Sequence, residues 1–145
     1  MSDQNRDQTG TTAGVDSLAG GFRGRVMVGE ERTLVQLRVD PLGDDSLLQV
    51  TGGRAHVGAV ATADGSQVQL SVVGSHKEGP LAEICAGQWS LLTGRVCVAV
   101  VGIHQDQATG QEIDSIVDNV RQGLDILASR WKEAAVVGKN DDSVE

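Results

Sequence analysis

The sequence contains three histidines, His56, His76 and His104. A neutral imidazole donates one hydrogen bond and accepts another, titrates near about pH 6.5, and can ligate a metal ion. Each histidine lies at the end of a predicted β-strand. A hairpin places the start of the fourth strand beside the finish of the fifth, and a helical crossover makes the fifth and sixth strands parallel. We therefore expect all three imidazoles at one edge of the sheet, where these strands end.

Residues that suit an anionic ligand surround these histidines in the sequence. They are glycines that allow a close approach of backbone and side chains that donate hydrogen bonds: Gly52, Gly53, Gly58, Ser75, His76, Lys77 and Thr109. Two predicted helices begin directly after strands that finish at this edge, so their N–H groups and positive dipole ends converge there. A phosphate or a carboxylate is the expected ligand.

Two kinds of catalysis are alternatives to simple binding. Three imidazoles are the right number of protein ligands for a catalytic zinc site, so a small metal-dependent enzyme built on the three histidines is one alternative. Metal is not favoured, because nothing in the sequence brings the three rings close enough to share an ion. Ser75 beside His76 does not indicate nucleophilic catalysis, since neighbouring strand residues point to opposite faces and no G-x-S-x-G motif is present.

The spacing of apolar residues along the sequence predicts the strands and helices that position these residues. Alternating apolar residues and turn signals predict five strands, over 22–28, 35–39, 46–50, 55–61 and 68–72. The period then changes and predicts a helix over 80–93, a strand covered on both faces over 95–103, and a long helix that Thr109 caps and whose apolar stripe ends at Trp131.

This order of elements predicts an α+β fold, a mostly antiparallel sheet of about six strands with two helices packed on one face. With 145 residues, the chain has room for one domain, which we place at 20–137 between a disordered tail over 1–19 and an acidic tail over 138–145. The uncovered face of the sheet, or one of its edges, could pair with another copy, and we expect a homodimer.

Composition narrows the class of function. The formal net charge is −8, and one Phe, two Trp and no Tyr are available for stacking, so neither nucleic acid nor an anionic membrane is an expected partner. No apolar stretch is long enough for a membrane span, and the first twenty residues lack the apolar block of a secretory signal, which favours a cytoplasmic protein. Cys85 and Cys97 lie in apolar runs and are expected to be buried free thiols.

Three glycine-histidine segments carry a family resemblance. They are VTGGRAHVGA from Val50, GSHKE from Gly74 and GIHQDQAT from Gly102. In order and spacing they resemble the small prenylated-flavin chaperones of the LpdD type, the D subunit of gallate and related hydroxyarene decarboxylases. The resemblance extends from about Leu47 to Trp131.

This resemblance implies a function and a set of residues. It implies a fold like that of a proteasome assembly chaperone subunit, and a non-enzymatic role in binding prenylated FMN, or FMN, for a UbiD-like non-oxidative decarboxylase of aromatic acids. The matched positions implied to bind the cofactor are Gly53, His56, Gly58, Ser75, His76, Lys77, Glu78, His104 and Thr109, with Ile103 beside the third histidine. The phosphate is expected near residues 75–77 and the ring system nearer the histidines. A cofactor-free assembly protein for a decarboxylase is a further alternative.

Overall fold

The sheet and helices follow the predicted order. The computed structural model describes residues 21–74 and 77–144. The strands are β1 (Gly24–Val28), β2 (Val35–Leu42), β3 (Asp45–Gly53), β4 (Ala59–Asp64), β5 (Gln67–Val72) and β6 (Cys97–His104), and the helices are η1 (Glu31–Thr33), α3 (Gly79–Thr93) and α4 (Gly110–Val144).

The six strands form one mixed sheet in the order β1-β2-β3-β6-β4-β5. Strands β1, β2 and β3 are successive antiparallel neighbours. Strand β6 lies between β3, to which it is parallel, and β4, to which it is antiparallel. Because β4 is also antiparallel to β5, β5 and β6 run in the same direction, which confirms the predicted crossover. The finishes of β3, β5 and β6 and the start of β4 therefore share one end of the sheet, which we call the histidine end.

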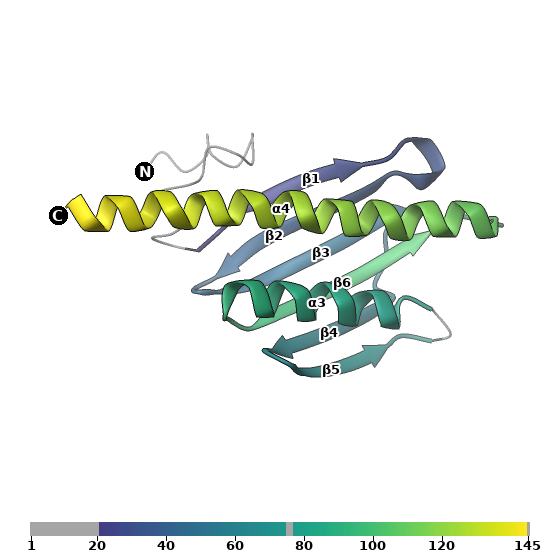
Figure 1. Ribbon diagram of the computed structural model, residues 1–145. Helices are drawn as coiled ribbons and strands as arrows, with labels where there is room; N and C mark the ends of the chain where they lie inside the picture. The colour runs from purple at the N-terminus through teal and green to yellow at the C-terminus, as the bar shows by residue number, and fades with distance from the viewer. Residues whose placement is uncertain (1–20, 75–76, 145) are drawn as a thin grey trace.

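Both helices cover the same face of the sheet and begin at the histidine end, at the right in Figure 1. Helix α3 packs over β4, β5 and β6, and α4 packs over β1 and β2. The α+β architecture with two helices on one face is thus confirmed. In the part of the chain that the structure describes, no helix has the length and apolar character needed to cross a membrane.

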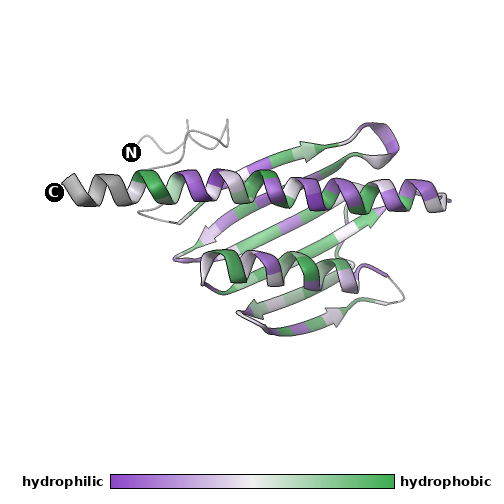
Figure 2. Cartoon of the chain, viewed as in Figure 1, coloured by the Kyte–Doolittle hydropathy of each residue, from purple (hydrophilic) through white to green (hydrophobic). Residues whose placement is uncertain are grey.

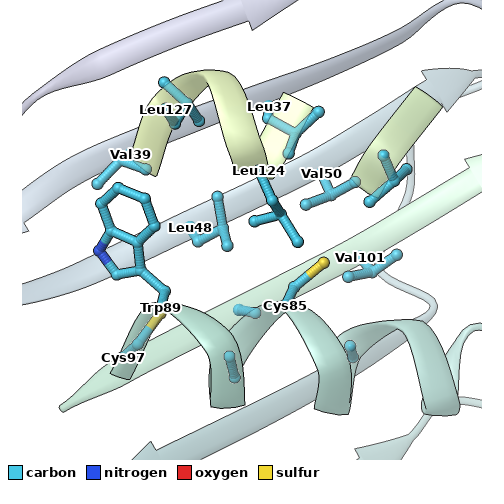
Figure 3. Packing of buried hydrophobic residues seen from close by; sticks show 14 of the residues in the cluster. Leu37, Val39, Leu48, Val50, Cys85, Trp89, Cys97, Val101, Leu124 and Leu127 are labelled. Carbon is cyan, nitrogen blue, oxygen red and sulfur yellow. The ribbon is translucent and has the colours of Figure 1, made fainter. Parts of the chain in front are cut away.

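The core lies between the helices and the sheet. In Figure 2 apolar and polar residues alternate along the strands, as expected for a sheet with one covered face. Figure 3 shows the inward residues of the sheet, Leu37, Leu48 and Val101 among them, meeting Trp89 of α3 and Leu124 of α4. Trp89 Nε1 donates a buried hydrogen bond to Ser46 Oγ at 3.1 Å, so the indole packs without leaving its N–H unsatisfied.

The two cysteines belong to this core. Cys85 and Cys97 are buried and form no disulfide, as predicted. Burial raises the pKa of each thiol from 9.0 to about 12, because a thiolate would lose its hydration inside the core.

Several element boundaries differ from those predicted by a few residues, and two differ the most. The fourth strand begins at Ala59 rather than 55, because residues 55–58 form a loop in which Val57 is 52% exposed. Helix α4 runs on to Val144, through most of the segment 138–145 that was expected to be a tail. An isolated Gly138 costs a helix only about 1 kcal/mol, which does not end it. The expected tail over 1–19 lies outside the described residues.

Candidate functional site

His56 and His104 meet at the histidine end. Their ring centroids are 6.2 Å apart, and the rings are nearly perpendicular at 81°. Gly53 pairs with His104 in the register of β3 and β6, and Arg54 N–H donates to the carbonyl of His104 at 2.9 Å. The loop after β3 therefore carries His56 back over β6, and the prediction that these two imidazoles lie at one edge of the sheet is confirmed. Ser75 and His76 lie outside the described residues.

Glu78 joins this pair from the start of α3. Its Oε2 accepts a hydrogen bond from the backbone N–H of Ile103 at 3.1 Å and lies 3.1 Å from His56 Nε2. The other ring nitrogen of His56, Nδ1, is 3.1 Å from the carbonyl of Arg54. Nδ1 thus has a hydrogen-bond partner in the backbone, and Nε2 lies within ion-pair distance of the Glu78 carboxylate. Only 11% of the Glu78 side chain is exposed, so its charge needs these partners.

Two glycines make this packing possible. A Cβ at Gly58 would lie 2.5 Å from Glu78 Oε1, and a Cβ at Gly102 would overlap the carbonyl oxygen of His56 at 1.5 Å. Any larger residue would displace the carboxylate or the loop. Gly58 was expected to admit a ligand, whereas the space beside it is filled by the carboxylate of Glu78.

A charged network continues from His104 along the surface. His104 Nε2 lies 2.8 Å from Asp106 Oδ1, and Arg54 donates to the same oxygen at 3.0 Å. These contacts, with the His104 hydrogen bond as the largest cause, lower the pKa of Asp106 below its ordinary value of 3.8. The network fixes the loop that carries His104 into α4.

The start of α4 is closed by a capping box. Thr109 Oγ1 accepts from the N–H of Glu112 at 3.1 Å, and Glu112 Oε1 accepts from the N–H of Thr109 at 3.0 Å. Arg32 of η1 donates to Glu112 Oε2 at 2.8 Å and to the carbonyl of Asp106 at 2.7 Å. The Arg32 hydrogen bond is the largest cause that lowers the pKa of Glu112 below 4.5. The predicted capping role of Thr109 is confirmed, and a carboxylate of the protein already occupies this helix start.

The start of α3 is different. Its first residues are Gly79, Pro80, Leu81 and Ala82, and the preceding Glu78 directs its carboxylate to β6 and His56 instead of capping the helix. Lys77 is exposed immediately before it. Of the two helix starts predicted to attract an anion, α3 is therefore the better candidate.

A hollow of about 450 Å3 lies between the two helix starts, over the finish of β6. One part of its lining is polar and includes Lys77, Glu78, His104 and Gln105. The rest is almost entirely aliphatic: Pro80, Leu81, Ile84, Ile103, Ala108, Ile113, Ile116 and Val117. This volume and this combination of a few polar groups with apolar walls are typical of sites for small organic ligands.

Residues 29–132 match the family model of the prenylated flavin chaperone LpdD-like domain. The chain belongs to this family. The match begins well before Leu47, where the motif resemblance starts, and so includes η1 and β2. No curated protein sequence matches the chain.

The LpdD-like domain is also similar to a chain in a crystal structure described as a novel chaperone complex for yeast 20S proteasome assembly. The TM-score is 0.54 with 14% sequence identity, over 75% of this chain and 96% of the other. At this identity the similarity shows the fold alone, and it agrees with the predicted proteasome-assembly-chaperone-like architecture.

The predicted site residues of this LpdD-like domain take different places. Lys77, Glu78 and His104 line the hollow, and His56 supports it from behind through Glu78 and His104. Gly53 instead borders a second hollow of about 320 Å3, together with Met27, Gln36 and Thr51 on the face away from the helices. Ligand contacts of all these residues stay predictions.

Sequence reasoning missed the aliphatic wall of the hollow. By its helical spacing, the sequence predicts only that Leu81 and Ile84 on α3, and Ile113 and Val117 on α4, belong to the apolar faces of the two helices. A usable signal was present: Ile113 directly follows Glu112 of the capping box, so it lies in the first turn of α4. It is 50% exposed, unlike the buried Ile116.

Metal ligation has no further support from the described residues. Within 21–74 and 77–144, no three or more His, Cys, Asp or Glu side chains are grouped so that they could hold an ion. The three-imidazole alternative also requires His76, which lies outside these ranges, so it stays a prediction.

Proposed function

We propose that the chain binds prenylated FMN in the hollow between the starts of α3 and α4 and carries it to a UbiD-like decarboxylase of aromatic acids. The observation that supports this most is the combination of a polar mouth and an aliphatic interior in one hollow, in a member of a prenylated flavin chaperone family. In this proposal the cofactor supplies the chemistry of decarboxylation inside the partner enzyme, and this chain only binds and releases it.

The residues present fit such a ligand. The ammonium group of Lys77 and the backbone N–H groups at the start of α3 would hold the phosphate. His104 and Gln105 offer donors and acceptors to the heteroatoms of the flavin, and the aliphatic residues would cover its hydrocarbon part. Among the described residues of the lining, Glu78 is the one carboxylate, and its Oε2 is directed to the N–H of Ile103 and to His56.

Release is as important as binding for a carrier. The hollow lies at the surface between two helix starts, and three of its polar groups, Lys77, His104 and Gln105, are at least partly exposed. Exposed ion pairs contribute only about 0–1 kcal/mol, so a phosphate held in this way can exchange. We expect a modest affinity that permits transfer to the decarboxylase.

We also propose that the protein is a homodimer that uses the face of the sheet away from the helices. Leu47, Val60, Val98 and Val100 are apolar residues at the outward positions of the three central strands, β3, β4 and β6. A contiguous apolar area of this kind is commonly covered by another protein surface. Light scattering coupled to size exclusion tests this, and a monomer at all concentrations would contradict it.

The function is tested by producing the chain together with a flavin prenyltransferase and purifying it without oxygen. The expected product is a coloured protein that retains prenylated FMN and transfers it to an apo-decarboxylase. The chain by itself should not decarboxylate aromatic acids. His76→Ala and Lys77→Ala should lose most of the flavin, whereas Lys132→Ala, an exposed lysine on α4 away from the hollow, should retain it. Unchanged flavin content in both site variants would reject the assignment of the GSHKE motif.

The same preparation discriminates the alternatives. Elemental analysis that finds less than about a tenth of an equivalent of metal would end the metal-enzyme hypothesis. Co-purification with a decarboxylase that survives replacement of His56, His76 and His104, with no flavin bound at any stage, would favour a cofactor-free assembly protein.

A further inference from the structure

The aliphatic wall of the hollow is built from two helices at helical spacing. Leu81 and Ile84 are three residues apart on α3, and Ile113 and Val117 are four residues apart on α4, so each pair lies on one face of its helix. All four side chains line the same hollow, and Ile103 of β6 adds to it from the sheet.

Part of this aliphatic wall does not belong to the hydrophobic core. Ile116, between the two α4 residues, is 7% exposed and belongs to the core cluster. Ile113 is 50% exposed, and it lines the hollow without packing into that cluster. It also lies in the first turn of α4, directly after the capping-box residue Glu112. The fold therefore leaves apolar surface open toward the hollow.

Prenylated FMN and FMN differ by one added hydrocarbon ring, which is bonded to the flavin through N5 and C6. Both carry the phosphate, the ribityl hydroxyls and the polar edge of the flavin, so Lys77, His104 and Gln105 have equivalent groups to bind in either. The prenylated form adds a non-aromatic ring with methyl substituents, and its burial against apolar side chains is favourable. Polar groups that contact only the phosphate, the ribityl chain or the pyrimidine edge bind both flavins alike, whereas an aliphatic wall around the added ring favours the prenylated form.

We propose that Ile113 and Val117, with Leu81 and Ile84 opposite, receive the added hydrocarbon ring and thereby make the site selective for prenylated FMN over FMN. This inference rests on the proposed function. A single methylene in an apolar pocket changes affinity by roughly 10–200-fold, so the added ring should give a preference of at least about tenfold.

The test measures equilibrium binding of reduced prenylated FMN and of reduced FMN to the full chain under anaerobic conditions. Ile113→Gln should weaken binding of prenylated FMN by about tenfold and change binding of FMN by no more than about twofold. Val117→Thr, which keeps the shape of the side chain, should act in the same direction and covers the case in which Ile113→Gln fails to fold. Leu91→Gln is the matched control, because Leu91 lies on α3, is 66% exposed and is not part of the hollow.

The outcomes separate this inference from the proposed function. If the wild-type chain binds both flavins with equal affinity, the site is a flavin site without this selectivity and the inference is overturned alone. If both wall variants keep the wild-type preference, the assignment of the wall is overturned. If neither flavin binds, the proposed function fails and the inference fails with it.

Discussion

Glu78 Oε2 lies 3.1 Å from Nε2 of His56, and this contact ties the start of α3 to the loop ahead of β4. The same oxygen accepts the N–H of Ile103, so one carboxylate joins three separate segments behind the hollow. Its position makes Glu78 a structural support for His56 and for the helix start as well as part of the lining.

Replacing Glu78 by Ala should therefore destabilise the fold. The change leaves the N–H of Ile103 without its side-chain acceptor and removes the carboxylate beside His56, and loss of a part-buried acceptor typically costs about 1–3 kcal/mol. Glu78→Gln keeps an acceptor oxygen and should cost less. Urea unfolding measures both, with Glu83→Ala, an exposed carboxylate on α3, as control. Equal stability of Glu78→Ala and Glu83→Ala would show that the contact is not a structural one.

Gly58→Ala should destabilise the fold through a clash with Glu78, and the Glu78→Ala variant can isolate this cause. The new methyl group would lie 2.5 Å from Glu78 Oε1, and overpacking of this kind costs about 1–3 kcal/mol. In a Glu78→Ala background the obstacle is removed, so the same glycine change should cost clearly less. Additive effects in the double-mutant cycle would contradict the proposed clash.

The two surface carboxylates should respond to different arginines. In the wild type both pKa values lie below the ordinary values of 3.8 for Asp106 and 4.5 for Glu112. Arg32→Ala should raise the pKa of Glu112 and leave that of Asp106 nearly unchanged, because Arg32 is the largest cause for Glu112 and the least for Asp106. Arg54→Ala should raise the pKa of Asp106 and leave that of Glu112 nearly unchanged. NMR titration of the carboxyl carbons measures both, and a reversed pattern would refute the network.

The direction of the pH effect follows from these shifts. A carboxyl group whose pKa is lower in the folded state stabilises that state above its unfolded pKa, and this stabilisation is lost as the pH falls through the folded value. The capping box should therefore loosen as the pH falls below 4.5 and through the lowered pKa of Glu112, and amide exchange at Thr109 should accelerate there relative to the helix interior. Asp106 is exposed and Glu112 is partly exposed, so high salt should weaken the effect.

The buried thiols should resist modification. With a pKa of about 12, Cys85 and Cys97 carry almost no thiolate at pH 8. Iodoacetamide should label neither in the folded protein and both in denaturant, as counted by intact mass. Rapid labelling of the folded protein would contradict the burial of these residues in the core.

Strands in which apolar and polar residues alternate regularly were predicted correctly from the sequence. Prediction failed where contacts with distant segments determine the local structure. Val35, Leu37 and Val39 alternate with polar residues and all three are fully buried. Ala55 and Val57 alternate in the same way, but the N–H groups of Arg54 and Gly58 bond to His104 and Val101 of β6, which holds this segment as a loop. The alternation of apolar and polar residues within a segment does not predict hydrogen bonds to a strand that is distant in the sequence.

The candidate site was predictable only in part for the same reason. Strand order and direction placed His56 and His104 at one end of the sheet, because that conclusion needs only topology. The contact of Arg32 with Glu112 depends on where η1 lies over the start of α4, which no local pattern encodes. The period of the apolar stripe on α4 could not distinguish Ile113, which is half exposed in the hollow, from Ile116, which also borders the hollow but is buried in the core.

The flavin content of the purified chain tests the central claim most directly. After production with a flavin prenyltransferase and anaerobic purification, the absorbance spectrum and mass spectrometry of the released ligand should show prenylated FMN approaching one equivalent per chain, lost on Lys77→Ala and kept on Lys132→Ala. A colourless protein under these conditions, with the prenyltransferase demonstrably active in the same cells, would contradict the account.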